Sequence, residues 1–403
     1  MKAKSIEKKG MVTLRHLPRK TTTHSIGPAT AGPTLVDTTL RDGAQAADVA
    51  LNHEARVRIA MELFNCGITE IEAGMPAMGP EEQRTIGSIV KALPDARIIG
   101  WCRALESDVH AAAQCGCDTI HISFPVSDLH LRCLNLREQW VEKNIPVLVK
   151  KAMNLAKRVT IGFQDASRTQ FNRLVRFASI AIESGVRRIR IADTVGILTP
   201  LCCARLIRAL AGRIYPTELE FHGHNDLGMA TANTITAIES GATAASVTLN
   251  GIGERSGNAA LEEVAVALLR GRPSRILGLR MDRIIALCEM IARITNDPIP
   301  RNKPVTGRNA FKHEAGIHTQ ALLRNTQAYE PFPPDLIGRS PSDIVAGTHS
   351  GSSGVQSMLA ASGITIDRST AAEMQTLIRK KAIQKGRSLE SKDVLNLYND
   401  KFR

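Results

Sequence analysis

Short apolar runs rich in β-branched residues alternate with amphipathic helical patterns from residue 34 to about residue 250. The helical patterns include Glu54–Cys66 and Arg173–Ser184. This alternation is typical of α/β proteins built on a parallel sheet. Eight strand–helix units over about 240 residues fit a (β/α)8, or TIM, barrel, although the periodicity alone leaves a doubly wound sheet open. The expected strands are Thr34–Asp37, Thr69–Ala73, Arg97–Trp101, Thr119–Ser123, Val159–Phe163, Arg188–Ala192, Leu219–His222 and Ala245–Leu249.

A small, mostly helical region is expected to follow the barrel. Met281–Thr295 reads as a helix, and Asn296–Gly307 is rich in Pro and Asn, which indicates a linker. Two further helices are predicted near Ser353–Ser362 and Thr370–Gly386. The expected division is a basic tail over 1–33, a barrel domain over 34–275 and helical subdomains with a linker over 276–403.

The net charge of +13 raises the hypothesis of a nucleic-acid partner. Residues 1–33 carry seven Lys/Arg and one Glu, a net of +6, which leaves +7 for the rest (13 − 6). This tail is poor in apolar residues, so we expect a disordered, solvated segment rather than a transit peptide. Only 3% of residues are aromatic and no basic recognition helix is evident, which argues against nucleic acid. The remaining charge suits anionic small-molecule substrates.

No apolar run approaches the roughly 20 residues that a membrane helix needs. The eight cysteines are scattered, without zinc-finger spacing. Reduced thiols in a cytoplasmic protein are therefore expected, and no membrane partner.

Two polar stretches lie at the ends of predicted strands. The first runs from Leu35 to Gln45 and places Arg41 and Asp42 after an apolar strand, where charge is costly unless it binds something. The second contains His222 and His224, which share one face of a strand because side chains alternate. Asp42 and two convergent imidazoles would make a divalent-metal site with open positions. A bare His-x-His pair is more often barrel filling, so this prediction depends on its context.

Further motifs follow in order along the chain. They are Pro76-Ala77-Met78-Gly79, Trp101-Cys102-Arg103, Pro125-Val126-Ser127-Asp128, Asp165-Ala166-Ser167-Arg168, Ala192-Asp193-Thr194-Val195-Gly196 and Gly251-Ile252-Gly253-Glu254-Arg255-Ser256-Gly257-Asn258-Ala259-Ala260-Leu261-Glu262-Glu263. With the two polar stretches, they resemble the metal-dependent 2-oxo-acid acyltransferases, the family of homocitrate, isopropylmalate and citramalate synthases. The resemblance extends from about Leu35 to past Gly351, and within the family it points to the homocitrate synthases used in nitrogen fixation.

This resemblance implies a TIM barrel that joins acetyl-CoA to a 2-oxo acid such as 2-oxoglutarate. A divalent ion (Mg, Mn or Zn) would be held by Asp42, His222 and His224 and would polarise the ketone. Arg41 would stabilise the developing negative charge, and Thr194 would bind the substrate carboxylate. The absence of a long regulatory domain after the barrel favours the homocitrate type over typical isopropylmalate synthases.

For several residues the resemblance implies a functional role, while a purely structural role is also open. Glu220 would orient the ligands from behind, or it forms a salt bridge. Asn258 would be a weak or water-mediated metal ligand, or it caps a loop. Candidates for the distal group of the substrate are Arg103, His121 and Ser123.

In relatives of this type a C-terminal segment reaches across a dimer into the neighbouring barrel. His318 and Tyr329 match the pair that acts on the acetyl-CoA proton and thioester, which implies a homodimer. His313 is a structural or coenzyme-contact candidate.

Three positions depart from the family pattern. Ala44 replaces a common Glu, and Cys133 replaces a commonly basic residue. Gln164 occupies the place of a Glu that relatives pair with the catalytic histidine, and an amide accepts no proton. The alternatives are a slower synthase, a synthase that uses another base, and a sibling synthase for another 2-oxo acid (isopropylmalate, citramalate or phosphonomethylmalate synthesis). An alternative of another class is a non-catalytic paralogue with a binding or regulatory role.

Overall fold

The computed structural model describes residues 32–271 and 278–402 of the 403-residue chain. Almost all of the expected tail over 1–33 lies outside the described residues, as does the expected domain boundary at 275.

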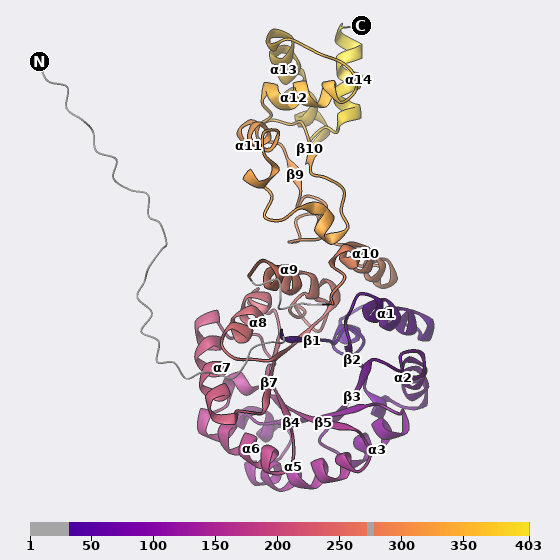
Figure 1. The fold of residues 1–403 in the computed structure, drawn as a ribbon, viewed down its shortest axis with the longest axis vertical. Helices are drawn as coiled ribbons and strands as arrows, with labels where there is room; N and C mark the ends of the chain where they lie inside the picture. The colour runs from indigo at the N-terminus through magenta and orange to yellow at the C-terminus, as the bar shows by residue number, and fades with distance from the viewer. Residues whose placement is uncertain (1–31, 272–277, 403) are drawn as a thin grey trace, which may run out of the picture. The chain divides into compact units, whose positions relative to one another are not determined.

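The predicted barrel is confirmed. Strands β1 to β8 run parallel, each beside the next, and β8 pairs with β1 to close the sheet (Figure 1). Every predicted strand is present, with ends within two residues of expectation. The strands are β1 (Thr34–Asp37), β2 (Glu70–Gly74), β3 (Arg97–Arg103), β4 (Thr119–Pro125), β5 (Arg158–Gln164), β6 (Arg188–Asp193), β7 (Glu218–Gly223) and β8 (Ala244–Val247).

Helices surround the barrel and bury its outer face (Figure 1). Their apolar stripes pack on outward strand residues such as Ile71 and Phe163, which are fully buried. Helix starts follow local chemistry: Asn52 accepts a hydrogen bond from the Ala55 amide at the start of α1. The helices are α1 (His53–Asn65), α2 (Pro80–Ala92), α3 (Glu106–Gln114), α4 (Asp128–Cys133), α5 (Glu138–Met153), α6 (Phe171–Glu183), α7 (Pro200–Ile214), α8 (Ala230–Glu239) and α9 (Leu261–Gly271).

The C-terminal region is helical, as predicted. Helix α10 (Ile284–Thr295) adds its apolar face to the core formed by α1, α2 and α9. A separate core joins the last three helices. The prediction missed α14, whose single fully buried residue, Val394, leaves only a weak apolar pattern. The remaining elements are α11 (Gly316–Leu322), α12 (Ser352–Ala360), α13 (Arg368–Lys385), α14 (Ser391–Phe402) and the parallel pair β9 (Lys312–His313) and β10 (Asp343–Ile344).

The barrel interior is filled by charged side chains as well as apolar ones. Val36, Ile99 and Ala244 form a small apolar layer. Glu70 pairs with Arg188, and two residues further along the same strands Glu72 pairs with Arg190. Both pairs are buried, so each charge depends on its partner.

Among the residues that the structure describes, no helix combines the length and the apolarity that a bilayer crossing needs.

Candidate metal centre and substrate cavity

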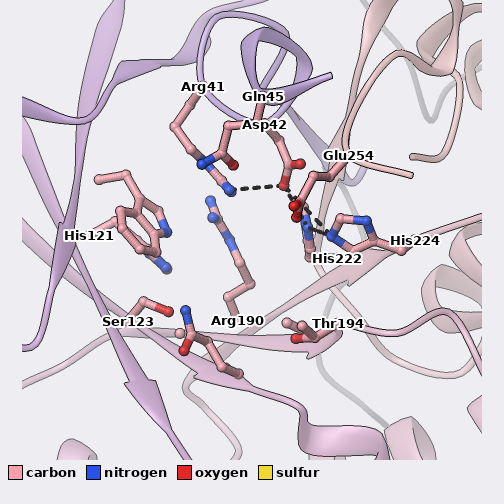
Figure 2. A pocket seen from close by; sticks show the side chains of 14 residues that line it. Arg41, Asp42, Gln45, His121, Ser123, Arg190, Thr194, His222, His224 and Glu254 are labelled. Atoms are coloured by element: carbon pink, nitrogen blue, oxygen red, sulfur yellow. Dashed lines mark hydrogen bonds and ion pairs between the residues drawn. The ribbon is translucent and has the colours of Figure 1, made fainter. Parts of the chain in front are cut away.

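A cavity of about 200 Å³ opens among the carboxyl ends of the barrel strands. Figure 2 shows side chains from opposite sides of the barrel converging on it. Active sites of TIM barrels are built at this end of the sheet. The lining residues are Arg41, Asp42, Gln45, Trp101, His121, Ser123, Gly162, Gln164, Arg190, Ala192, Thr194, His222, His224 and Glu254.

Asp42, His222 and His224 form one cluster, as predicted from the sequence (Figure 2). Asp42 Oδ2 lies 3.1 Å from His222 Nε2 and 3.8 Å from His224 Nε2, and the two Nε2 atoms are 3.2 Å apart. Burial alone would raise the pKa of Asp42, but Arg41 and His222 hold it well below its usual range. Burial and the neighbouring His222 lower the pKa of His224 to about 4, which leaves a neutral imidazole.

These donors fit a divalent cation. Ligands about 2.0–2.1 Å from one ion lie about 3.0–3.4 Å apart. Two of the three observed separations, 3.1 and 3.2 Å, fall in this range, and the third is longer at 3.8 Å. A carboxylate and neutral imidazoles are the donor types that such ions take. Asn258, the other predicted ligand, lines a neighbouring cavity; it is paired with His224 in an isolated β-bridge, and its side-chain amide nitrogen donates to the Ile252 carbonyl. The buried Asn258 Oδ1 has no hydrogen-bond partner in the described protein.

Arg41 is held on three sides. Its Nη1 lies 2.9 Å from Asp42 Oδ2, its Nε pairs with Glu72, and its guanidinium lies 5.3 Å from the Trp101 ring centre. Within the part of the chain that the structure describes, its guanidinium has no other hydrogen bond, so its remaining donors can face a ligand. This arrangement provides a fixed positive charge beside the metal cluster.

Glu220 contacts Arg190 and Ser246, at 2.7 Å each, instead of a hydrogen bond to either histidine. Arg190 in turn lies 2.7 Å from Glu72. Burial would lower the pKa of Arg190, but Glu220 and Glu72 raise it, so its positive charge is kept at the cavity floor. Of the two roles considered for Glu220, the contacts present are those of the salt bridge.

Glu72 and Arg190 were not singled out from the sequence. The sequence does contain a pattern that indicates them. Two strands that are otherwise apolar each carry two charged residues spaced two apart: Glu70 and Glu72 in one, and Arg188 and Arg190 in the other. Such pairs face the inside of a barrel together, where opposite charges must meet. Gln45, Trp101 and Glu254 also line the cavity without having been proposed as site residues.

Thr194 lines the cavity, and its hydroxyl oxygen accepts a 2.8 Å hydrogen bond from the Asp165 amide. The hydroxyl proton is therefore available to a ligand. His121 Nδ1 lies 2.8 Å from the Thr160 hydroxyl, and its buried Nε2 has no partner in the described protein. Burial and Arg190 hold the pKa of His121 well below its usual range, so the ring is neutral. Ser123 and Gln164 complete this side of the cavity.

The site residues singled out from the sequence that do not line the cavity are Arg103, Glu220, Asn258, His313, His318 and Tyr329. Arg103 instead binds Asp108 through Nε at 2.8 Å and Nη2 at 3.0 Å. His318 is exposed and stacks on Tyr329, with ring centres 4.1 Å apart. His313 lies on β9, and burial lowers its pKa.

Comparisons with known proteins identify both parts of the chain. Residues 32–291 match the HMGL-like family, and residues 305–386 match the family described as homocitrate synthase post-HMGL domain-like. A homocitrate synthase of Frankia sp. is 40% identical, over 89% of this chain and 88% of its own. A 2-isopropylmalate synthase of Caldanaerobacter subterraneus is 38% identical, over 91% of this chain and 95% of its own.

A solved structure of hydroxymethylglutaryl-CoA lyase from Pseudomonas aeruginosa has the same barrel fold, with a TM-score of 0.59. It covers 73% of this chain and 98% of its own, at 20% identity.

The fold and the cluster at its mouth define a TIM-barrel enzyme with a candidate metal site. The chain belongs to the family of homocitrate, isopropylmalate and citramalate synthases, the DRE-TIM synthases, which are metal-dependent and condense acetyl-CoA with a 2-oxo acid.

Proposed function

We propose that this protein is a homocitrate synthase that joins acetyl-CoA to 2-oxoglutarate, of the type used in nitrogen fixation and acting in the cytoplasm. The supporting observation is a pair of buried nitrogens at the cavity, Arg190 Nη1 and His121 Nε2, that have no protein partner in the described chain. A second carboxylate on the substrate would accept from such groups. An apolar branched side chain would leave them unpaired, which is costly. The similarity to two homocitrate synthases of Frankia supports 2-oxoglutarate as the 2-oxo acid.

Each residue then has a part in the condensation. Asp42, His222, His224 and Asn258 would hold the divalent ion, which supplies Lewis-acid polarisation of the ketone when bound. The Thr194 hydroxyl donates a hydrogen bond to the 1-carboxylate of the 2-oxo acid. A base takes a proton from the acetyl methyl, and the resulting carbanion forms a bond to the ketone carbon. Arg41 stabilises the electron pair displaced onto the former ketone oxygen, and water then cleaves the thioester to release coenzyme A.

Gly162 provides a test of the distal site. A Cβ at residue 162 would lie 2.5 Å from His121 Nε2 and 3.5 Å from Ser123 Oγ. Gly162→Ala should therefore displace the groups proposed to bind the second carboxylate and raise the KM for 2-oxoglutarate at least about tenfold. Gly212→Ala is the matched control, because nothing lies within 4 Å of its Cβ position. An unchanged KM in Gly162→Ala would contradict binding of the distal carboxylate by His121.

The base is proposed to come from a neighbouring subunit, because neither His318 nor Tyr329 is among the described residues that line the cavity. Mixing inactive His222→Ala and His318→Ala proteins should then restore activity. In a mixed dimer one site keeps both residues. Subunit exchange is verified separately with tagged chains. Verified heterodimers without recovered activity would place both residues in the site of one chain.

Gln164 lines the cavity at the end of β5 with an amide in place of a carboxylate. A carboxylate there would favour the imidazolium form of His318 and orient its ring. A charge-assisted contact of about 1.5–3 kcal/mol corresponds to roughly 10- to 150-fold in rate. Gln164→Glu should therefore raise kcat and shift the pH–rate profile, whereas Gln114→Glu, on the exposed end of α3, should not. A fall in kcat would indicate a site tuned to another base or substrate.

A sibling synthase for another 2-oxo acid is the second candidate. Its support is the isopropylmalate synthase relative and a 2-phosphonomethylmalate synthase of Streptomyces rubellomurinus, 34% identical over 97% of its length. Mass spectrometry of the product formed from acetyl-CoA and each 2-oxo acid separates these candidates. The absence of product with every acid would favour a non-catalytic paralogue.

A further inference from the structure

The loop Gly251–Asn258, between β8 and α9, is the wall between two cavities. Glu254 lines the 200 Å³ cavity at the metal centre. Gly253, Arg255 and Asn258 line a second cavity of about 990 Å³ on the other side. The position of this loop therefore sets the place of Asn258 beside His224 and the shape of the substrate cavity.

The loop is held by a small set of hydrogen bonds, one of which reaches the loop after β7: the Asn225 amide donates to Gly257 O at 2.9 Å. Its backbone closes through Asn258 N to Gly251 O at 2.9 Å and Gly257 N to Glu254 O at 3.0 Å. Arg255 has a left-handed backbone, with φ of 57°, which residues bearing a Cβ seldom adopt. A strained non-glycine residue requires compensating contacts from its surroundings.

The Arg255 side chain makes those contacts with two other loops. Its Nε lies 2.7 Å from Asp226 Oδ1 and its Nη2 lies 2.9 Å from Asp226 Oδ2, on the loop after β7. The same Nη2 donates to the Thr194 carbonyl, 2.7 Å away, on the loop after β6. One planar guanidinium thus joins the loops that carry Asn258, His224 and Thr194.

We infer that Arg255 is a positioning residue that fastens the Gly251–Asn258 loop to the loops after β6 and β7. In doing so it fixes Asn258 at the metal centre and Thr194 at the 2-oxo acid. Lysine cannot replace it, because one ammonium cannot bind both carboxylate oxygens and the carbonyl in this fork geometry. This inference rests on the proposed function for its substrate and on the candidate metal centre for its metal readout.

The test compares Arg255→Ala and Arg255→Lys with Arg280→Ala. Arg280 forms the same two-bond contact with Asp282, at 3.0 and 2.8 Å, on an exposed surface, and its side chain does not line either cavity. The first readout is Mn²⁺ affinity of the metal-free protein by calorimetry. Mutation of a residue that orients metal ligands typically weakens metal affinity 10- to 100-fold. Both Arg255 variants should weaken Mn²⁺ binding by about tenfold or more, and Arg280→Ala should leave it unchanged.

The second readout is steady-state kinetics with the preferred 2-oxo acid. The Arg255 variants should raise its KM about tenfold or more, and millimolar guanidinium should partly restore Arg255→Ala but not Arg255→Lys. Wild-type Mn²⁺ affinity and KM in folded Arg255→Ala would overturn the inference while leaving the proposed function intact. If the wild-type protein turns over no 2-oxo acid, the proposed function fails, and the Mn²⁺ affinities alone decide the role of Arg255.

Discussion

His222→Ala and His224→Ala should each remove the bound divalent metal and the activity together. Each replaces one of two buried imidazoles whose Nε2 atoms lie 3.2 Å apart beside Asp42. Loss of Lewis-acid stabilisation of about 4 kcal/mol or more corresponds to at least about a thousandfold in kcat. Metal content after gel filtration, measured by elemental analysis, checks the first part, and thiol release from acetyl-CoA checks the second.

His110→Ala is the control for loss of a histidine, because this side chain is exposed on α3. It should keep both metal and turnover. Undiminished metal content in folded His222→Ala or His224→Ala would remove that residue from the ligand set.

Glu72→Gln should destabilise the fold strongly. The Glu72 carboxylate is fully buried between Arg41 and Arg190. Burial opposes its ionisation, but Arg190 and Arg41 keep the pKa of Glu72 well below its usual range, so the group is charged at neutral pH. Removal of one partner from a buried ion pair costs about 3–5 kcal/mol, because the remaining charges are left uncompensated. The free energy of unfolding in urea at pH 7 measures the effect.

Glu81→Gln is the matched control on the surface. It removes the partner of Arg84, in a pair whose side chains are 82% and 63% exposed, and should change the free energy of unfolding by no more than about 1 kcal/mol. A loss in Glu72→Gln no larger than in Glu81→Gln would mean that the barrel interior is not held by this pair.

The strands were predictable because a closed parallel barrel buries every strand against helices. That burial demands short apolar runs with β-branched residues, such as those around Ile98 and Ile161, and the runs are visible in the sequence. Helix α14 has little to bury beyond Val394, so its pattern is weak and it was missed. The ends of strands were less exact, since pairing continues past the apolar residues to Arg103 and Pro125.

The cluster of Asp42, His222 and His224 was predictable because the two histidines are two residues apart on one strand and all three residues belong to the family motifs. Which charged residues pair with one another inside the barrel could not be predicted from the sequence. Arg103 looked like a substrate ligand from its motif, but Asp108, five residues later, binds its guanidinium. Glu220 reaches Arg190 from the neighbouring strand β7, whereas Glu72 reaches it from β2, which is not adjacent to β6 in the sheet. The contact between Glu72 and Arg190 therefore depends on closure of the sheet, which no local pattern encodes.

The most direct test of the central claim is thiol release from acetyl-CoA by the metal-loaded protein across 2-oxoglutarate, 2-oxoisovalerate and pyruvate. The proposed distal contacts of Arg190 and His121 predict the highest kcat/KM for 2-oxoglutarate, by at least about tenfold. Equal or greater kcat/KM for 2-oxoisovalerate or pyruvate, or no release with any of the three, would contradict the assignment as a homocitrate synthase.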